Sequence, residues 1–203
     1  MTHITIVRHG TTEWMERGLT HGVRDSRLSA LGREQAQLVA ARLKQDSFDA
    51  FYTSPAGRAV ETARIIAAEI GMQPVILEGL REIDFGWMEG KPLRLFLWLQ
   101  SPLWGKFGQA LRFYIRQLSG ERWSQVKERV LAALQYIVEQ RPAGHVLVVT
   151  HNGTHNAILE VALNESHSRP KIRPFAPCAI TEIEVDSNGR GHLIALNQAE
   201  HLG

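Results

Sequence analysis

Cysteine is nearly absent from this sequence: Cys178 is the only one among 203 residues. A single cysteine excludes a disulfide within one chain and a zinc site built on several thiolates. The net charge is also small, +2 with neutral histidines, which does not favour nucleic acid or an anionic membrane as a partner. The most apolar stretch, 93–118, is interrupted by charged residues, proline and glycine, so it falls short of the roughly 20 apolar residues of a membrane span. We therefore expect no nucleic-acid partner and no integral membrane segment.

The overall composition, 44% hydrophobic and 22% charged residues, is typical of a globular protein. A length of 203 residues suits one α/β domain, residues 1–203, with room for a modest insertion. The first residues run directly into an apolar strand pattern, without the charged and apolar regions of a secretory signal. We expect a cytoplasmic protein.

The stretch Ile4–Val7 consists of β-branched residues and predicts a short buried strand. It is followed directly by Arg8, His9 and Gly10. In open α/β sheets, ligands bind at the carboxyl ends of the strands. An imidazole is a potential nucleophile, and a guanidinium is a permanent planar cation that suits phosphate. The first hypothesis is therefore phosphoryl chemistry on His9.

Helical and strand patterns alternate along the rest of the chain. Ser29 is in a position to cap one helix, and Ser54-Pro55 is expected to open another that ends near Gly71. The apolar run His145–Thr150 predicts a second buried strand. This alternation predicts an α/β fold, a three-layer α/β/α sandwich around a mainly parallel central sheet. A small helical cap insertion is expected at about 92–120.

Two of the predicted strands end in histidine, His9 and His151, and a glycine follows each closely. Arg58 lies about one turn from the start of its helix, so with Arg8 it can reach the same edge of the sheet. A phosphoryl group in transfer requires cations and backbone N–H groups fixed around its oxygens. These residues therefore predict a phosphate pocket.

A carboxyl group is also required, to protonate the leaving oxygen. Glu82 follows the third predicted strand and is the candidate, with Asp84 and Glu89 as alternatives. His151 and His155 have the spacing of two metal ligands on one helix, but the glutamate of a zincin motif is absent and His151 is expected to precede the helix. We expect no metal and no cofactor.

Four motifs in order along nearly the whole chain resemble those of the histidine phosphatase superfamily, which includes cofactor-dependent phosphoglycerate mutases and many small phosphatases. They are Arg8-His9-Gly10 with Thr12 and Trp14, Ser54-Pro55 with Arg58 and Glu61-Thr62-Ala63, Leu80-Arg81-Glu82 with Gly86 and Glu89-Gly90, and Thr150-His151. The resemblance implies that His9 is the phosphorylated nucleophile and Glu82 the proton donor. It also implies that Arg8, Arg58 and His151 form the phosphate pocket without a metal.

Several residues expected to contact the substrate depart from the superfamily's pattern. Met15 stands where many members have a phosphate-contacting asparagine, and Asn152 replaces the glycine after the second histidine. The Asn152 amide is therefore a candidate for the phosphate contact that a methionine at position 15 cannot supply. Thr11 replaces a common glutamate, and His21 a glutamine. The predicted substrate-binding residues are Gly10, Thr11, Thr12, Met15, His21, Gly22, Asn152 and Gly153.

The insertion at 92–120 has more than one interpretation. Its apolar residues pack on the domain, or its aromatic side chains line the entrance to the site. The aromatic residues concerned are Phe96, Trp98, Trp104, Phe107 and Phe113. The second interpretation predicts a preference for esters with an apolar or aryl group. A dimer interface or a membrane-surface patch is the third, so a homodimer stays an open alternative.

The sequence thus predicts a phosphoric monoester hydrolase. It would be a metal-independent phosphatase that hydrolyses a small-molecule phosphate ester through a phosphohistidine on His9. A cofactor-dependent phosphoglycerate mutase is the first alternative, although mutases of this kind resemble longer chains with a more polar cap. The others are a phosphohistidine phosphatase acting on a protein and a non-catalytic phosphate-binding or interaction protein.

Overall fold

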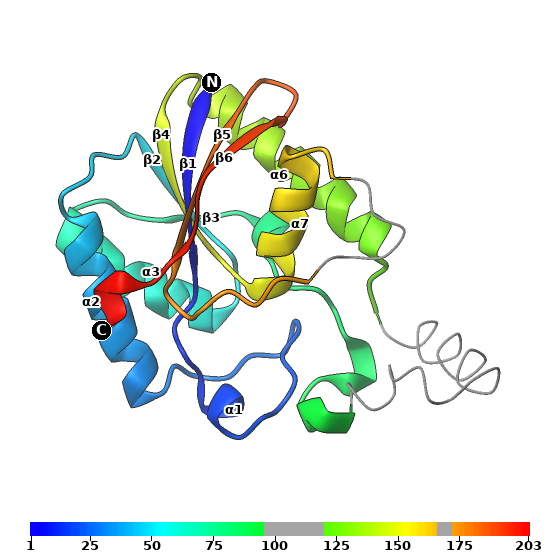
Figure 1. The fold of residues 1–203 in the computed structure, drawn as a ribbon. Helices are drawn as coiled ribbons and strands as arrows, with labels where there is room; N and C mark the ends of the chain where they lie inside the picture. Colours follow the sequence, from blue (N-terminus) through cyan, green and yellow to red (C-terminus); the bar gives the residue numbers. More distant parts are fainter. Residues whose placement is uncertain (96–119, 166–171) are drawn as a thin grey trace.

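The computed structural model describes residues 1–95, 120–165 and 172–203, with a six-stranded sheet at its centre (Figure 1). The strands are β1 (Thr2–Arg8), β2 (Ala50–Thr53), β3 (Val75–Ile76), β4 (His145–Thr150), β5 (Ile180–Val185) and β6 (Gly191–Gln198). They lie in the order β3-β2-β4-β1-β5-β6. The first four strands in the chain are parallel, whereas β5 is antiparallel to both β1 and β6. This mainly parallel, mixed sheet confirms the predicted fold class.

Helices cover both faces of the sheet (Figure 1). α2 (Ala30–Leu43) and α3 (Gly57–Ile70) pack on one face, and α6 (Trp123–Gln140) and α7 (Asn152–Ala162) pack on the other. The short helical segments are α1 (Glu13–Glu16), η1 (Glu78–Leu80), η2 (Gly86–Met88) and η4 (Glu200–Leu202). Each face of the sheet has its own apolar core, so the three-layer arrangement is confirmed.

The two central strands supply both cores because successive side chains of a strand point to opposite faces. In β1, Ile4 and Ile6 pack with α6 and α7, whereas Val7 packs with α2 and α3. In β4, Val148 packs on the side of α6 and α7, and Val149 packs on the side of α2 and α3. Parallel strands buried on both faces read as continuous apolar runs, which is why both strands were recognisable in the sequence.

The ends of two helices follow the predictions, and the start of one does not. The Ser29 side chain caps α2 by accepting a hydrogen bond from Gly32 N at 3.2 Å. Gly71 ends α3 in the left-handed conformation, with φ of 71°, which suits glycine. The predicted cap at Ser54 is wrong, because α3 begins at Gly57 after Ala56 and has no side-chain cap. Ser54 is directed instead toward the start of α7.

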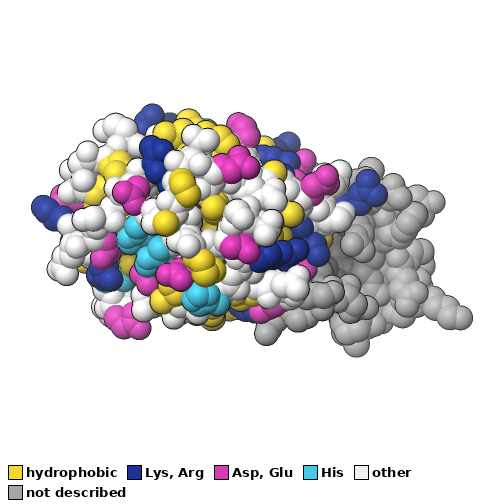
Figure 2. Space-filling model, turned by 90° about the horizontal axis from the view of Figure 1, so that it is seen from above, with side chains coloured by type: hydrophobic (Ala, Val, Ile, Leu, Met, Phe, Trp, Pro, Cys, Tyr) yellow, Lys and Arg dark blue, Asp and Glu magenta, His cyan; other side chains and the backbone are white. Residues whose placement is uncertain are grey.

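The two ends of the sheet differ in character. Seen from the end where the chain starts, Figure 2 shows histidine side chains among acidic ones. Here His3 stacks on His145 with ring centroids 4.2 Å apart, and His3 lies 3.8 Å from Glu182. The carboxyl ends of β1 and β4 lie at the opposite end of the sheet, where the register pairs Arg8 of β1 with Thr150 of β4. This register brings His9 and His151 side by side.

The predicted insertion at 92–120 is described only at its two ends. Pro92 forms an isolated bridge with Leu19, and Leu93 N donates to Gly18 O at 2.8 Å. Residues 96–119, and with them all five aromatic residues predicted to line the entrance, lie outside the described residues. No helix within 1–95, 120–165 and 172–203 combines the length and the apolar character needed to span a bilayer.

Candidate active site

His9 follows the last residue of β1 and is almost fully buried, with 3% of its surface exposed. Its Nδ1 lies 2.8 Å from the carbonyl oxygen of Gly10, and its Nε2 lies 3.3 Å from Nε of Arg58, which donates. A carbonyl oxygen only accepts, so the ring proton belongs on Nδ1, and the lone pair of Nε2 accepts the hydrogen bond from Arg58. Burial lowers the pKa of His9 well below 6.5, and the nearby charges of Arg58 and Arg8 lower it further. His9 is therefore neutral at pH 7.

Arg58 is fully buried in the first turn of α3 and is held from several directions. Its Nη1 donates to Asp25 Oδ1 at 2.9 Å and to Arg24 O at 3.1 Å, and its Nη2 donates to Gly22 O at 2.8 Å. With Nε on His9, the guanidinium is fixed by one carboxylate, two loop carbonyls and the imidazole. The arginine cannot turn without breaking this set, so its position against His9 is rigid.

Glu89 supports the loop that holds Arg58. Its carboxylate accepts hydrogen bonds from Val23 N at 2.8 Å and Arg24 N at 2.6 Å, and also from Phe85 N at 3.0 Å. A Cβ at Gly22 would lie 2.0 Å from Glu89 Oε1, so the loop requires glycine there. Glu89, one of the alternative acids, is thus occupied by backbone N–H groups.

Arg8 ends β1 and turns its guanidinium toward a distant segment. Nη1 donates a short hydrogen bond to the carbonyl oxygen of Phe175, and Nη2 lies 3.7 Å from Sδ of Met15. Its Nε is buried and has no hydrogen-bond partner within the described residues. Burial lowers the pKa of Arg8, and the charge of Glu82 opposes that shift. One donor of this cation is therefore unused by the described protein.

His151 precedes α7 as its N-cap residue and is fully buried. Its ring centroid lies 5.1 Å from that of His9. Nε2 lies 2.6 Å from Oγ of Ser54, whereas Nδ1 has no partner among the residues that the structure describes. Burial first, and then the charge of Arg58, lower the pKa of His151 well below 6.5. His151 is a second neutral imidazole beside the first.

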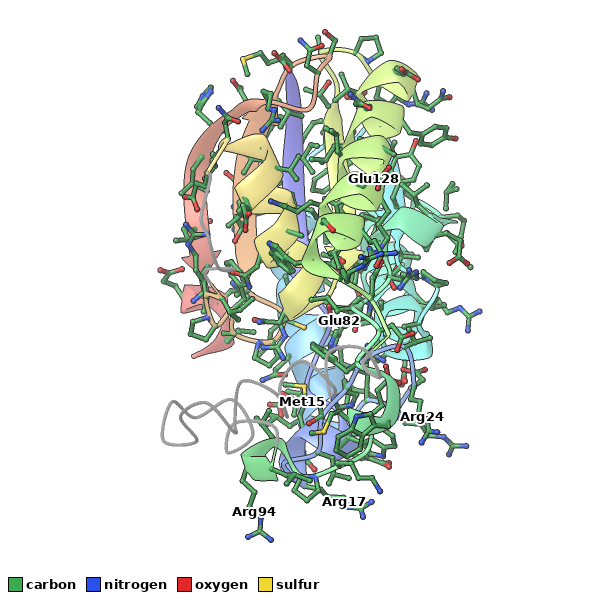
Figure 3. All side chains as sticks on the ribbon, turned by 90° about the vertical axis from the view of Figure 1, so that its right-hand side faces the viewer. Met15, Arg17, Arg24, Glu82, Arg94 and Glu128 are labelled. Atoms are coloured by element: carbon green, nitrogen blue, oxygen red, sulfur yellow. The ribbon has the colours of Figure 1, made fainter. Side chains whose placement is uncertain are left out.

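Glu82 lies in the loop after η1, and its carboxylate sits on the first turn of α7. Gly153 N donates to Oε2 at 3.1 Å, and Thr154 N donates to Oε1 at 3.1 Å. A Cβ at Gly153 would lie 2.6 Å from Oε1 and 2.5 Å from Ile83 Cδ1, so the carboxylate fits only against glycine. The N-terminus of a helix favours a negative charge. Figure 3 shows Glu82 between Glu128 of α6 and Met15.

The structure therefore separates the three carboxylates that the sequence left as alternatives. Glu82 accepts a hydrogen bond from Gly153, two residues after His151. Its charge also acts on Arg8, whose pKa it raises against the effect of burial. Asp84 Oδ1 accepts from Gly86 N at 2.7 Å within its own turn. Glu89 holds the Gly22–Arg24 loop. Of the three, Glu82 is the one held on the first turn of α7, which His151 precedes, and its role as the acid stays a prediction.

Most of the predicted substrate-binding residues form bonds within the protein. Gly10 N donates to Thr62 Oγ1 at 3.1 Å, and Thr11 donates from both N and Oγ1 to Gln35. Thr12 caps α1, and its Oγ1 lies 2.9 Å from Nε2 of His21. The N–H of Gly10 is thus engaged rather than directed at a ligand. Roles of these residues in substrate binding stay predictions.

Two further predicted residues, Met15 and Asn152, are linked to Arg8. Met15 contacts the guanidinium through its sulfur. Oδ1 of Asn152 accepts a hydrogen bond from Phe175 N at 2.9 Å, and Phe175 in turn bonds Arg8 through its carbonyl oxygen. Sequence reasoning missed Phe175 altogether, because nothing in the pattern connects residue 175 with residue 8.

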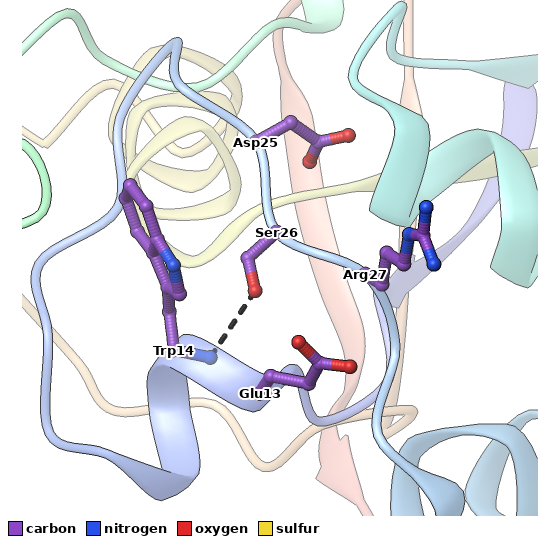
Figure 4. Close-up of a pocket in the computed structure, with 5 residues that line it drawn as sticks. All are labelled: Glu13, Trp14, Asp25, Ser26 and Arg27. Atoms are coloured by element: carbon purple, nitrogen blue, oxygen red, sulfur yellow. Dashed lines mark hydrogen bonds between the residues drawn. The ribbon is translucent and has the colours of Figure 1, made fainter.

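A pocket of about 410 Å³ opens beside this site (Figure 4). It is lined by Glu13, Trp14, Asp25, Ser26 and Arg27, and Trp14 N donates to Ser26 Oγ at 3.1 Å. Asp25 links the pocket to the site, since its carboxylate also holds Arg58. The histidines and Glu82 do not line it.

Two neutral imidazoles, two arginines and one carboxylate thus converge at the carboxyl ends of β1 and β4. In an α/β protein this is the arrangement expected of an enzyme that handles phosphoryl groups. The sequence model of the histidine phosphatase superfamily (branch 1) matches residues 4–198. The chain belongs to this superfamily.

Related sequences and a solved structure agree with this assignment. Phosphoglycerate mutase-like protein 4 of Arabidopsis thaliana is 33% identical over 184 residues, which are 90% of this chain and 77% of the relative. A Hydrogenobacter thermophilus protein, provisionally named phosphoserine phosphatase 2, is 32% identical over 168 residues, 78% of this chain and 77% of the relative. The solved structure of Bacillus stearothermophilus YhfR has a TM-score of 0.85 and 31% identity and covers 100% of both chains. Phosphatases and mutase-like proteins thus both occur among the relatives.

Proposed function

We propose that this protein is a metal-independent phosphatase that hydrolyses small phosphate monoesters through a phosphohistidine on His9. The observation that carries the proposal is the state of the His9 ring. With its proton donated from Nδ1 to Gly10 O, Nε2 carries the lone pair that attacks phosphorus, which requires the hydrogen bond from Arg58 Nε to be given up. Burial and two neighbouring cations keep the ring neutral, and a neutral imidazole is the nucleophilic form.

In the first step, Nε2 of His9 forms a bond to phosphorus while the bond from phosphorus to the ester oxygen breaks. Glu82 in its protonated form gives its proton to the leaving oxygen, which departs as an alcohol. In the second step, Glu82 accepts a proton from water as the water oxygen attacks phosphorus. The P–N bond breaks, inorganic phosphate leaves, and both His9 and Glu82 return to their starting states.

The charge of the transferring group requires donors fixed before the reaction. Nε of Arg8 and Nδ1 of His151 are buried polar atoms without a partner among the described residues. Buried donors without a partner are uncommon in proteins, and phosphoryl oxygens would satisfy both. Arg58 contributes its positive charge and fixes the lone pair of His9.

The relatives include phosphatases and mutase-like proteins and leave the substrate open. A relative at 32% identity carries a phosphoserine phosphatase name, and this chain departs from the superfamily at Met15 and Asn152. A preference for esters with an apolar or aryl group depends on the aromatic residues of 96–119 and stays a prediction.

The test is phosphate release from aryl, sugar, nucleotide and three-carbon phosphates in excess EDTA, with His9→Ala and Glu82→Gln beside the parent. His192→Ala is the matched control, because this histidine lies on the distant β6 and is largely exposed. We expect release that resists EDTA, survives in the control and disappears in His9→Ala. Rapid mixing should also trap an acid-labile phosphoprotein in the parent and the control, and none in His9→Ala.

Each other outcome changes the assignment. Release abolished by EDTA would assign the chemistry to a metal. Interconversion of phosphoglycerates without net release would favour the mutase alternative. Binding of phosphate with no turnover of any ester would indicate a non-catalytic phosphate-binding protein.

A further inference from the structure

Three residues of the chain, Arg173–Phe175, form a strap between the start of α7 and the end of β1. Side chains from the first turns of α7 hold this strap. Asn156 Oδ1 accepts from Arg173 N at 2.7 Å, and its Nδ2 donates to Arg173 O at 2.9 Å. Oδ1 of Asn152 accepts from Phe175 N at 2.9 Å. The strap is thus fixed at both of its ends by hydrogen bonds between asparagine side chains and its own backbone.

The ring of Phe175 is fixed as well. It stacks on His155, with ring centroids 3.8 Å apart and an angle of 4° between the planes. Both residues are almost completely buried, and neither nitrogen of His155 has a hydrogen-bond partner among the described residues. His155 is therefore a packing surface for the phenyl ring.

The carbonyl oxygen of Phe175 is the acceptor that holds Nη1 of Arg8. Phe175 consequently presents its N–H to Asn152 and its carbonyl to Arg8. A shift of Phe175 would move that carbonyl, and the guanidinium would follow it. With Nη1 held there, Arg8 leaves its buried Nε without a partner in the described protein.

We propose that Asn152 is a positioning residue that fixes Arg8 through the backbone of Phe175. The side-chain Oδ1 of Asn152 accepts from Phe175 N, so this side chain acts on the phosphate pocket only through the backbone of Phe175. This differs from the sequence expectation that the Asn152 amide contacts the substrate itself. The inference rests on the proposed function, in which Arg8 binds the phosphoryl group.

The test compares Asn152→Gly with Asn197→Gly. Asn197 supplies the matched control, because its Oδ1 accepts from Ala176 N at 2.8 Å, one residue beyond the strap. Asn197 has a φ of 51°, which glycine adopts without strain. Both variants thus lose one asparagine-to-backbone hydrogen bond, but only Asn152→Gly frees Phe175.

The first readout is the Arg8 Nε–H signal in ¹H–¹⁵N spectra, which is assigned by its disappearance in Arg8→Lys. The second readout is the Kd of inorganic phosphate. In Asn152→Gly we expect the Nε–H signal to broaden and exchange faster with water, and phosphate to bind about tenfold more weakly. In Asn197→Gly both readouts should match the parent within about twofold. In the Arg8→Lys background, Asn152→Gly should weaken phosphate binding little further, because the two residues act as one unit.

An unchanged Arg8 signal in Asn152→Gly would overturn the proposal, and so would fully additive effects of Asn152→Gly and Arg8→Lys on phosphate affinity. Additivity would mean that Asn152 contacts phosphate directly. A parent that binds no phosphate would count against the proposed function instead. The Arg8 signal would then still decide whether Asn152 positions the arginine.

Discussion

Oγ of Ser54 lies 2.6 Å from Nε2 of His151, and both residues are fully buried. Ser54 Oγ accepts a hydrogen bond from Ala56 N at 3.3 Å, and we infer that it donates its own hydrogen to the imidazole. A hydroxyl that donates to Nε2 places the ring proton of neutral His151 on Nδ1. Nδ1 is the nitrogen without a partner among the described residues, so Ser54 selects the tautomer that can donate to a phosphoryl oxygen.

Ser54→Ala should therefore impair catalysis more than it impairs folding. Without the hydroxyl, His151 can place its proton on either nitrogen, and we expect kcat/KM to fall about tenfold. Thr2→Val is a matched control, because the buried Thr2 hydroxyl also donates one hydrogen bond, to Arg141 O at 3.0 Å, at the other end of the sheet. Equal kcat/KM for the two variants would contradict the role of Ser54.

Gly153→Ala should displace the carboxylate of Glu82. The new Cβ would lie 2.6 Å from Glu82 Oε1 and 2.5 Å from Ile83 Cδ1, so the acid must move. An alkyl ester requires a proton on its leaving oxygen, whereas p-nitrophenolate leaves readily without one. We expect kcat to fall about 100-fold for an alkyl phosphate and much less for p-nitrophenyl phosphate.

Glu82→Gln should show the same dependence on the leaving group as Gly153→Ala. A uniform loss across all esters would mean that Gly153→Ala disturbs the phosphate pocket and not the acid. Steady-state kinetics on a series of esters with leaving groups of graded pKa provides the measurement.

The pH profile should reflect the neutral state of His9. Burial, and then the charges of Arg58 and Arg8, lower its pKa well below 6.5. Nε2 therefore stays unprotonated as the pH falls through 6.5, and protonation removes the nucleophile only at lower pH. We expect kcat/KM, corrected for the ionisation of the substrate, to hold at pH 6.5 and to decline only well below it. A corrected acid limb centred at or above pH 6.5 would contradict this.

His155 should make the fold sensitive to acid. Burial first, and then the charge of Arg8, lower its pKa to about 3, so the unfolded chain binds this proton at higher pH than the folded one. Stability that is present above pH 6.5 is then lost as the pH falls toward 3, by about 1.4 kcal/mol per pH unit.

His155→Phe keeps a ring against Phe175 and removes the titrating group. The free energy of unfolding is measured in urea at pH 7 and at pH 4.5. From the higher to the lower pH, it should fall by about 2 to 3 kcal/mol less in the variant than in the parent. Because neither His155 nitrogen has a partner among the described residues, the variant should fold at pH 7. An equal loss in both proteins would show that other groups cause the acid sensitivity.

Local sequence pattern is enough to predict the central strands and the two histidines that follow them. β-branched residues at Ile4–Val7 and the apolar run His145–Thr150 each form a strand that is buried on both faces. Parallel strands end at one edge of a sheet, which predicts His9 and His151 at the same edge; they are neighbours because β1 pairs directly with β4. The cap of α2 at Ser29 and the end of α3 at Gly71 are also predictable from sequence, because capping depends on one residue and its nearest neighbours.

The contacts that fix the site depend on packing between segments far apart in the chain. Glu82, Asp84 and Glu89 lie within eight residues of one another, and local pattern cannot tell them apart; packing against Gly153 of α7 does. Ser54 was expected to cap α3 and instead faces His151, 97 positions away. Phe175 holds Arg8 across 167 positions. Contacts between distant segments depend on how the layers pack on both faces of the sheet, and no local preference encodes that.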